Sequence, residues 1–391
     1  MTVDPSASPS KDAATESRPL LRVEDLAVSF GDGPAAVRAV NGVSLTIHPR
    51  QTLAVVGESG CGKSVTALSL LQLIPRPQGR IDRGRAWFRP HGPSWLGQEI
   101  DLLRLDARQI RRIRGAEIAM IFQEPMTSLN PVFTIGDQIA EAVMLHQKVG
   151  LREALDIAED ALKEVGIRDP RGRLGAYPHQ FSGGMRQRVM IAMALACRPS
   201  LLLADEPTTA LDVTIQAQIL ELLSELRRTR GMSIMLITHS LGIVAGHADV
   251  VCVMYAGRVV EYAGVFDLFA RPMHPYTRGL FASIPRPRQP RARLRTMHEV
   301  ISDPEEFRRL PRSAEGIRPW WPAHEPPGDL HPSGDPAGDA SLLEVAPNHW
   351  VCVWRTEAVA ASSPRAPDLP CRVTDDPRRP TGGQSIDSSI G

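Results

Sequence analysis

Residues 57–64 read Gly-Glu-Ser-Gly-Cys-Gly-Lys-Ser, and this segment constrains the fold more than any other feature of the chain. Residues 53–57 form an apolar run that predicts a buried strand, and residues 63–74 predict a helix that ends before Pro75. Glycines between a strand and a helix allow backbone N–H groups to surround phosphate oxygens, and the helix start adds a positive dipole. The segment therefore predicts a phosphate-binding loop in an α/β fold.

The loop also carries side chains that suit a nucleotide. Lys63 supplies a positive charge for the β- and γ-phosphates, and the Ser64 hydroxyl is a ligand for Mg²⁺. Cys61 has no chemistry of its own here and fills a crowded loop. The residues expected to contact the nucleotide are Gly57, Glu58, Ser59, Gly60, Cys61, Gly62, Lys63, Ser64 and Val65. Taken alone, this motif has an alternative interpretation, which is a chance glycine loop that binds no nucleotide.

Two acidic residues follow a second apolar run, at 201–204. Asp205 ends that run, so its carboxylate is expected at the edge of the sheet, where it can hold the hydration shell of Mg²⁺. Adjacent strand residues face opposite ways, so Glu206 has a separate role, and we expect it to be the general base that polarises the attacking water. The structural alternative is an acidic turn before Pro207.

A second candidate anion site lies at Ser182, Gly183 and Gly184, before a helix expected at 185–197. Ser182 is a good N-cap, and the simpler interpretation is only that. The functional interpretation is that its hydroxyl and the two glycine N–H groups bind phosphate. We expect this segment to lie too far from the phosphate loop to share one nucleotide within a monomer. The pair therefore suggests two subunits arranged head to tail around two ATP molecules.

Composition argues against binding driven by overall charge and against a segment that crosses a membrane. The 391 residues carry a net charge of +1, from 45 basic and 44 acidic residues, so no overall field favours nucleic acid or acidic lipid. The five cysteines have no paired spacing, which suggests a reducing cytosol. No apolar run is long enough to cross a bilayer, and the first residues do not resemble a signal peptide. We therefore expect any contact with a membrane to be made through a partner.

The pattern along the chain predicts four regions. Residues 1–18 are expected to be disordered, and residues 19–273 to form a nucleotide-binding domain. An all-helical subdomain is expected at about 124–181, within that domain. Residues 274–356 are expected to form a small C-terminal extension, and residues 357–391 a disordered tail.

Two observations support these boundaries. Five residues fall on one helical face of the expected subdomain: Leu151, Leu155, Ala158, Leu162 and Val165. Of the 34 prolines, 19 lie in the last 122 residues, so we expect the compact α/β core to end near Met273.

With these motifs the chain resembles the ATP-binding cassette (ABC) family. The resemblance implies a phosphate-loop core with a small N-terminal antiparallel β part, the inserted helical subdomain and a Pro-rich C-terminal extension. It implies that Gln123 senses the metal and joins the core to the subdomain, and that His239 contacts the γ-phosphate. Ala210-Leu211-Asp212 resembles the loop through which two subunits communicate. Phe30 is expected to stack on adenine, although it could be a plain strand residue.

The resemblance narrows to the ATPases of dipeptide and oligopeptide permeases. The segments that carry it are 123–131, 177–182, 205–214 and 274–277. It implies ATP and Mg²⁺ as cofactors and a position at the cytoplasmic face of the cell membrane, as a peripheral protein. The implied partners are two membrane-spanning permease subunits, a second ATPase subunit (a sister chain or a copy of this one) and an extracytoplasmic peptide-binding protein.

One departure and several alternatives accompany this resemblance. The subfamily commonly groups several cysteines in the C-terminal extension, whereas only Cys352 matches that pattern here, so we expect no iron–sulfur cluster. Nickel importers share much of the pattern, so the cargo could be nickel or another small solute. A soluble, non-transport cassette protein would typically carry a coiled coil or a second phosphate loop, and neither pattern occurs. A phosphate-loop kinase or GTPase would lack residues 182–184.

Overall fold

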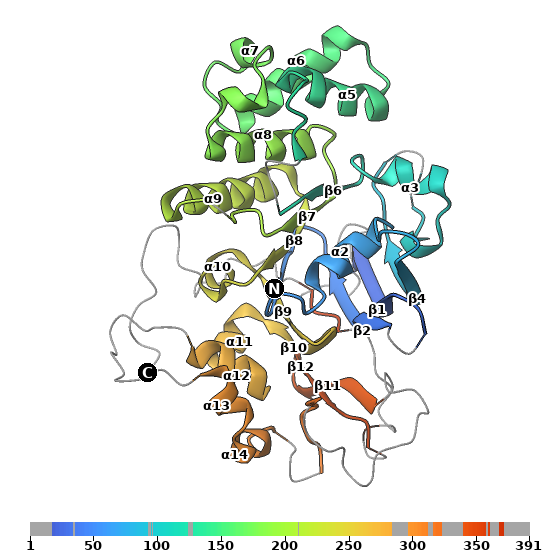
Figure 1. Ribbon diagram of the computed structural model, residues 1–391, viewed down its shortest axis with the longest axis vertical. Coiled ribbons are helices and arrows are strands. Elements are labelled where there is room, and N and C mark those ends of the chain that lie inside the picture. The colour runs from blue at the N-terminus through green and yellow to red at the C-terminus, as the bar shows by residue number, and fades with distance from the viewer. Residues whose placement is uncertain are drawn as a thin grey trace, which may run out of the picture.

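Two β-sheets organise the computed structural model of the chain, as Figure 1 shows. The structure describes residues 18–33, 36–92, 95, 97–123, 128–209, 211–283, 296–311, 316–322, 339–356, 359 and 367–370. Within these ranges, no helix combines the length and the apolar character needed to cross a membrane.

The larger sheet has the strand order β11-β12-β10-β9-β3-β8-β7-β6. Its strands are β3 (Thr52–Val56), β6 (Ile118–Ile121), β7 (Leu201–Asp205), β8 (Ser233–Thr238), β9 (Val250–Tyr255), β10 (Arg258–Gly264), β11 (Ala340–Ala346) and β12 (His349–Trp354). The five strands from β9 to β6 are parallel, and β3 is buried along its whole length between β8 and β9. Their carboxyl ends therefore meet at one edge, which is where ligands bind in open parallel sheets.

The smaller sheet is antiparallel and has the order β2-β1-β4-β5. Its strands are β1 (Leu21–Phe30), β2 (Val37–Ile47), β4 (Gly79–Phe88) and β5 (Ile100–Asp101). Alternate residues of β1, among them Leu21 and Val23, are fully buried in a core shared with β3 and α2. This sheet corresponds to the expected N-terminal antiparallel part, and the α/β class is confirmed.

A group of helices lies at one end of the molecule in Figure 1, between β6 and β7 in the chain. Its members are α5 (Ile135–Gln147), α6 (Leu151–Glu164), α7 (Pro170–Arg173), η4 (Pro178–Gln180) and α8 (Gly183–Leu195). The face predicted for α6 is buried at Ala158, Leu162 and Val165, but Leu151 is 55% exposed. Leu151 is the first residue of α6, and Leu155 is half-buried.

The remaining helices connect or cover the sheets. They are α2 (Lys63–Leu70), η3 (Leu102–Arg104), α3 (Ala107–Ile113), α9 (Val213–Arg230), α10 (Leu241–His247), α11 (Val265–Ala270), α12 (Pro275–Ala282), α13 (Met297–Ile301) and α14 (Pro304–Arg308). Figure 1 shows α11–α14 and β11 at the end of the molecule opposite α5–α8.

The core does not end near Met273, contrary to the expectation from proline content. Strand β12 pairs antiparallel with β10 and is buried at every residue, and β11 then pairs with β12. Neither strand contains a proline, and two prolines of this region, Pro275 and Pro304, are the first residues of helices α12 and α14. A high proline content in a region therefore does not prevent short proline-free segments within it from forming strands.

The expected disordered tail at 357–391 is wrong for residues 367–370. The Asp368 carboxylate lies 2.6 Å from His48 Nε2, and the carbonyl of Leu369 accepts a hydrogen bond from Gln51 Nε2 at 2.9 Å. The Thr46 hydroxyl donates to the carbonyl of Pro367 at 2.5 Å. This segment is held by buried polar groups far away in the sequence, which local composition does not reveal. Residues 1–17 and 371–391 lie outside the described residues.

Candidate nucleotide-binding site

The loop between β3 and α2 needs glycine at two positions. Gly57 and Gly62 have φ values of +154° and +101°. A Cβ atom on Gly57 would lie 2.2 Å from the carbonyl oxygen of Met254, and one on Gly62 would lie 2.3 Å from that of Ala39. The loop can therefore pack against β9 and β2 only without side chains at these positions, which leaves its backbone N–H groups to form a concave surface.

Lys63 lies inside this loop. Its Nζ donates to the carbonyl oxygens of Gly57 at 2.9 Å and Glu58 at 2.8 Å, and the residue is only 5% exposed. The loop's own carbonyls thus hold the ammonium group beside the N–H groups that would bind phosphate. Burial raises the pKa of the neighbouring Cys61 thiol, although the Lys63 charge lowers it, and this favours the neutral thiol expected of a space-filling residue.

Ser64 and Asp205 meet at the start of α2 and the end of β7. Burial is the main cause that raises the pKa of Asp205, and a hydrogen bond from Ser64 lowers it. Asp205 Oδ1 is buried without a hydrogen-bond partner in the described part of the chain. An unpaired buried carboxylate oxygen next to a hydroxyl is the donor set that Mg²⁺ prefers, so the residues present fit this ion.

Glu206 lies at the centre of a polar cluster. Its Oε2 accepts hydrogen bonds from Gln123 Nε2 at 3.3 Å and from the Thr209 hydroxyl at 2.9 Å, and its Oε1 lies 3.3 Å from His239 Nδ1. Gln123, Glu206 and His239 follow the neighbouring strands β6, β7 and β8. The structure therefore brings together three residues that the sequence analysis named separately. Thr209, three residues after Glu206, was missed, although its place in the same turn is a usable signal.

The backbone at Glu206 has a left-handed conformation, with φ of +46°. This conformation turns the chain directly after Asp205, so the two adjacent carboxylates lie in different surroundings. Asp205 contacts Ser64, whereas Glu206 contacts Gln123, Thr209 and His239. The predicted division of roles between the two acids therefore has a geometric basis.

The Ser182 segment lies at the start of α8. The Ser182 hydroxyl accepts a hydrogen bond from the Met185 N–H at 3.4 Å, which is the N-cap interaction, and Ser182 and Gly183 are exposed. A Cβ on Gly184 would lie 2.9 Å from the Ile215 side chain of α9, and Asp212 caps that helix through the Ile215 N–H at 2.9 Å. The two predicted dimer segments are thus neighbours on one exposed surface. Ala210 lies outside the described residues.

Phe30 is the last residue of β1, where it pairs with Val37 of β2 and Gly79 of β4. Its ring is half-buried and lies against Gly79, because a Cβ atom on Gly79 would lie 2.8 Å from the ring. The stacking of Phe30 on adenine stays a prediction.

One contact to the phosphate loop was not foreseen. The Glu58 N–H donates to the Tyr276 hydroxyl at 3.1 Å, across 218 positions of sequence. Tyr276 belongs to the segment 274–277, which the sequence analysis used only as a family marker. No local pattern could have indicated that it touches the loop.

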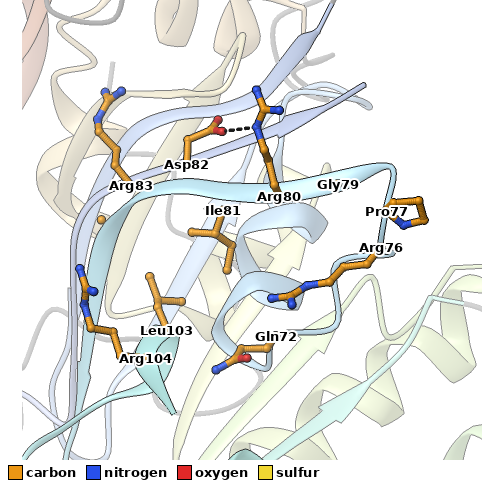
Figure 2. Close-up of a pocket in the computed structure, with 11 residues that line it drawn as sticks. Gln72, Arg76, Pro77, Gly79, Arg80, Ile81, Asp82, Arg83, Leu103 and Arg104 are labelled. Atoms are coloured by element: carbon orange, nitrogen blue, oxygen red, sulfur yellow. Dashed lines mark hydrogen bonds and ion pairs between the residues drawn. The ribbon is translucent and has the colours of Figure 1, made fainter. Parts of the chain in front are cut away.

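A cavity of about 600 Å³ lies elsewhere, between the end of α2, β4 and η3 (Figure 2). Four arginines line it: Arg76, Arg80, Arg83 and Arg104. Arg80 pairs with Asp82 at 2.8 Å, and Arg83 pairs with Asp25 at 2.7 Å. Acidic neighbours thus neutralise much of its charge, and none of its lining residues belongs to the nucleotide site.

The described residues contain no group of three or more His, Cys, Asp or Glu side chains placed to hold a metal. Cys352 is buried in β12, and burial raises the pKa of its thiol to about 12. The expectation that the chain holds no iron–sulfur cluster stays a prediction.

A parallel sheet, a glycine loop opening a helix, and two acids at the end of a neighbouring strand define a phosphate-loop nucleoside triphosphatase. Comparison with known proteins specifies the branch. Residues 40–209 match the family model described as ABC transporter, and residues 260–312 match the one described as Oligopeptide/dipeptide transporter, C-terminal region.

Similar proteins agree with these matches. The dipeptide transport ATP-binding protein DppD of Bacillus subtilis is 52% identical over 267 residues, which cover 68% of this chain and 77% of that protein. A Brucella abortus protein named "Putative peptide import ATP-binding protein" is 54% identical over 269 residues, covering 69% of this chain and 78% of its own length. A solved dimeric ATP-binding cassette with bound ADP and Pi has the same fold, with a TM-score of 0.54 at 24% identity over 63% of this chain and 98% of that chain.

The chain belongs to the ABC transporter family. It is an ATP-binding and ATP-hydrolysing cassette.

Proposed function

We propose that the chain powers the uptake of dipeptides or oligopeptides as the ATPase subunit of an ABC importer. The gathering of Gln123, Glu206 and His239 beside the phosphate loop carries the ATPase part of this proposal. The peptide cargo rests on the match of residues 260–312 and on the names of the relatives.

The residues of the site divide the work of hydrolysis. The loop N–H groups and Lys63 hold the β- and γ-phosphates of ATP. The Ser64 hydroxyl and the Asp205 carboxylate would hold Mg²⁺, which when bound neutralises charge on the phosphate oxygens. Phe30 stacks on the adenine ring.

Glu206 orients the attacking water and accepts its proton. Gln123 and Thr209 hold one oxygen of the Glu206 carboxylate, and His239 lies beside the other. This arrangement restricts the carboxylate to one orientation, which lowers the entropy cost of reaching the reactive geometry. His239 is exposed and can extend to the γ-phosphate.

Ser182, Gly183, Gly184 and Asp212 complete the site of a second cassette. Because the first N–H groups of a helix have no partner within the helix, the exposed start of α8 can bind the γ-phosphate held by a partner's loop. ATP then closes the pair, and hydrolysis reopens it. The second cassette is a sister chain or another copy of this one.

The complete importer contains two membrane-spanning permease subunits and an extracytoplasmic peptide-binding protein. The cassette is bound to the permease at the cytoplasmic face of the cell membrane. Closure of the cassette pair moves α5–α8 through Gln123, and these helices transmit the motion to the permease. Coupling of this kind is reciprocal, so peptide delivery stimulates hydrolysis.

Uptake in cells tests the cargo. A strain without this gene is supplied with the wild-type chain or with the Glu206→Gln variant, and di- and tripeptides serve as the sole nitrogen source. We expect growth and uptake of labelled dipeptide only with the wild type. Nickel accumulation that depends on the wild-type chain, without peptide uptake, would assign the same machinery to the other cargo.

A further inference from the structure

A buried hydroxyl from the C-terminal region of the chain contacts the phosphate loop. Tyr276, the second residue of α12, is fully buried, and its hydroxyl accepts the Glu58 N–H at 3.1 Å. Glu58 directly follows Gly57, at the point where the chain leaves β3 and enters the loop. This N–H therefore donates to the protein, and it anchors the turn from which the following N–H groups extend.

An aromatic stack fixes the position of the Tyr276 ring. The ring centroids of Tyr255 and Tyr276 are 4.6 Å apart, and Trp321 stacks on Tyr255 at 4.4 Å. Tyr255 ends β9, directly after Met254, whose carbonyl closely approaches Gly57. The start of the loop thus contacts two groups: the Met254 carbonyl at the end of β9, which approaches Gly57, and the Tyr276 hydroxyl, which accepts the Glu58 N–H. Burial raises the pKa of Tyr276, so the phenol is neutral in this position.

A buried polar network fixes the start of α12. The Glu261 carboxylate accepts the N–H groups of Met273 at 2.7 Å and His274 at 2.9 Å, and it lies 2.6 Å from His349 Nε2. His274 Nδ1 accepts the Tyr276 N–H at 3.2 Å, and its Nε2 lies 3.0 Å from the Trp320 carbonyl. Glu261, His274 and His349 are all at most 1% exposed. Strand β12 and the segment around Trp320 are thereby connected through α12 to the loop.

We propose that Tyr276 is a positioning residue of the ATP site, through which the C-terminal region sets the conformation of the phosphate loop. The proposal rests on the nucleotide role given to that loop above. Without the hydroxyl, the Glu58 N–H loses a partly buried hydrogen bond that holds the start of the loop, so the loop relaxes toward other conformations. The phosphate-binding N–H groups are then no longer preorganised, and ATP binds more weakly.

The Tyr276→Phe variant of the full chain tests this proposal, with Tyr262→Phe as its matched control. Tyr262 is also fully buried, and its hydroxyl donates to the Thr46 carbonyl at 3.0 Å, away from the loop. We expect Tyr276→Phe to raise the KM for ATP by about three- to tenfold, the equivalent of one hydrogen bond, with kcat within about twofold of wild type. Tyr262→Phe should leave both constants unchanged.

Hydrogen–deuterium exchange gives a readout that does not depend on activity. Exchange in a peptide covering residues 57–62 should be faster in Tyr276→Phe than in the wild type and unchanged in Tyr262→Phe. Trp321→Phe, which shrinks the stack while keeping the hydroxyl, should show the same changes to a smaller degree.

The outcomes separate this proposal from the proposed function. A wild-type KM and wild-type exchange in Tyr276→Phe would overturn the positioning role. Equal rises of KM in both tyrosine variants would also overturn it, since they would reflect general loss of stability. If the wild-type chain itself neither binds nor hydrolyses ATP, and Lys63→Ala behaves identically, the nucleotide function fails instead.

Discussion

His239 Nδ1 lies 3.3 Å from Glu206 Oε1, across 33 positions of sequence and at the ends of two neighbouring parallel strands. The histidine side chain is 67% exposed and the glutamate side chain only 15%. The carboxylate is therefore held within the protein while the imidazole faces solvent. This asymmetry suits a fixed base beside a side chain that reaches toward a phosphate group.

The Glu206→Gln variant should bind ATP but hydrolyse it about 10²- to 10⁴-fold more slowly than the wild type. An amide keeps the shape of the carboxylate but cannot accept the proton of water. Nucleotide affinity and phosphate release are measured on the same preparation. Turnover at the wild-type rate would remove Glu206 from its role.

Lys63→Ala should abolish detectable ATP binding, because the charge held between the Gly57 and Glu58 carbonyls is lost. Lys163→Ala is the matched control, since Lys163 is an exposed residue of α6. Calorimetric titration with ATP compares the two variants. Equal affinity for ATP in both variants would contradict the role of Lys63 in binding the phosphates.

Two glycines of the loop should respond differently to alanine. Gly60 and Gly62 both have positive φ, but a Cβ on Gly60 meets nothing within 4 Å, whereas one on Gly62 lies 2.3 Å from the Ala39 carbonyl. Gly60→Ala therefore carries only the backbone strain, roughly 1–2 kcal/mol, and Gly62→Ala adds a steric conflict. Urea unfolding should show the larger loss of stability for Gly62→Ala. Equal losses would mean that the close approach to β2 is unimportant.

Asp205→Asn should stabilise the metal-free protein at neutral pH while preventing Mg²⁺-dependent hydrolysis. Burial raises the pKa of Asp205 above its unfolded value, so ionisation of this carboxylate destabilises the fold as pH rises through the folded pKa. Below the unfolded value, about pH 4, the carboxyl is neutral in both states and the penalty is absent. Thermal unfolding without metal, followed from pH 7 downward, should show the advantage of the variant shrinking. A constant difference at every pH would exclude ionisation as its cause.

Truncation after residue 366 should lower the free energy of unfolding by about 1–3 kcal/mol, because buried Thr46, His48 and Gln51 lose their partners. Truncation after residue 370 removes only positions beyond this contact and serves as the control. Chemical denaturation of the two shortened chains measures the difference. Equal stability of the two chains would show that residues 367–370 contribute nothing to the free energy of unfolding.

Much of the site could be predicted because its residues lie next to elements with clear local patterns. The phosphate loop, Asp205 and Glu206 directly follow short apolar runs, and the ends of parallel strands converge. The contact between Glu58 and Tyr276 could not be predicted, since it depends on how α12 packs rather than on any neighbouring residue. Strand β12 and the docked segment at 367–370 were missed because a Pro-rich average conceals short stretches that find their partners in distant parts of the chain.

The pairing of β12 with β10 also affects how the protein is made. Because the ribosome synthesises β12 long after β10, that edge of β10 stays uncovered through the synthesis of many residues. An uncovered strand edge is a template for association between nascent chains, so this stage of biogenesis is the one at which a chaperone would be most useful.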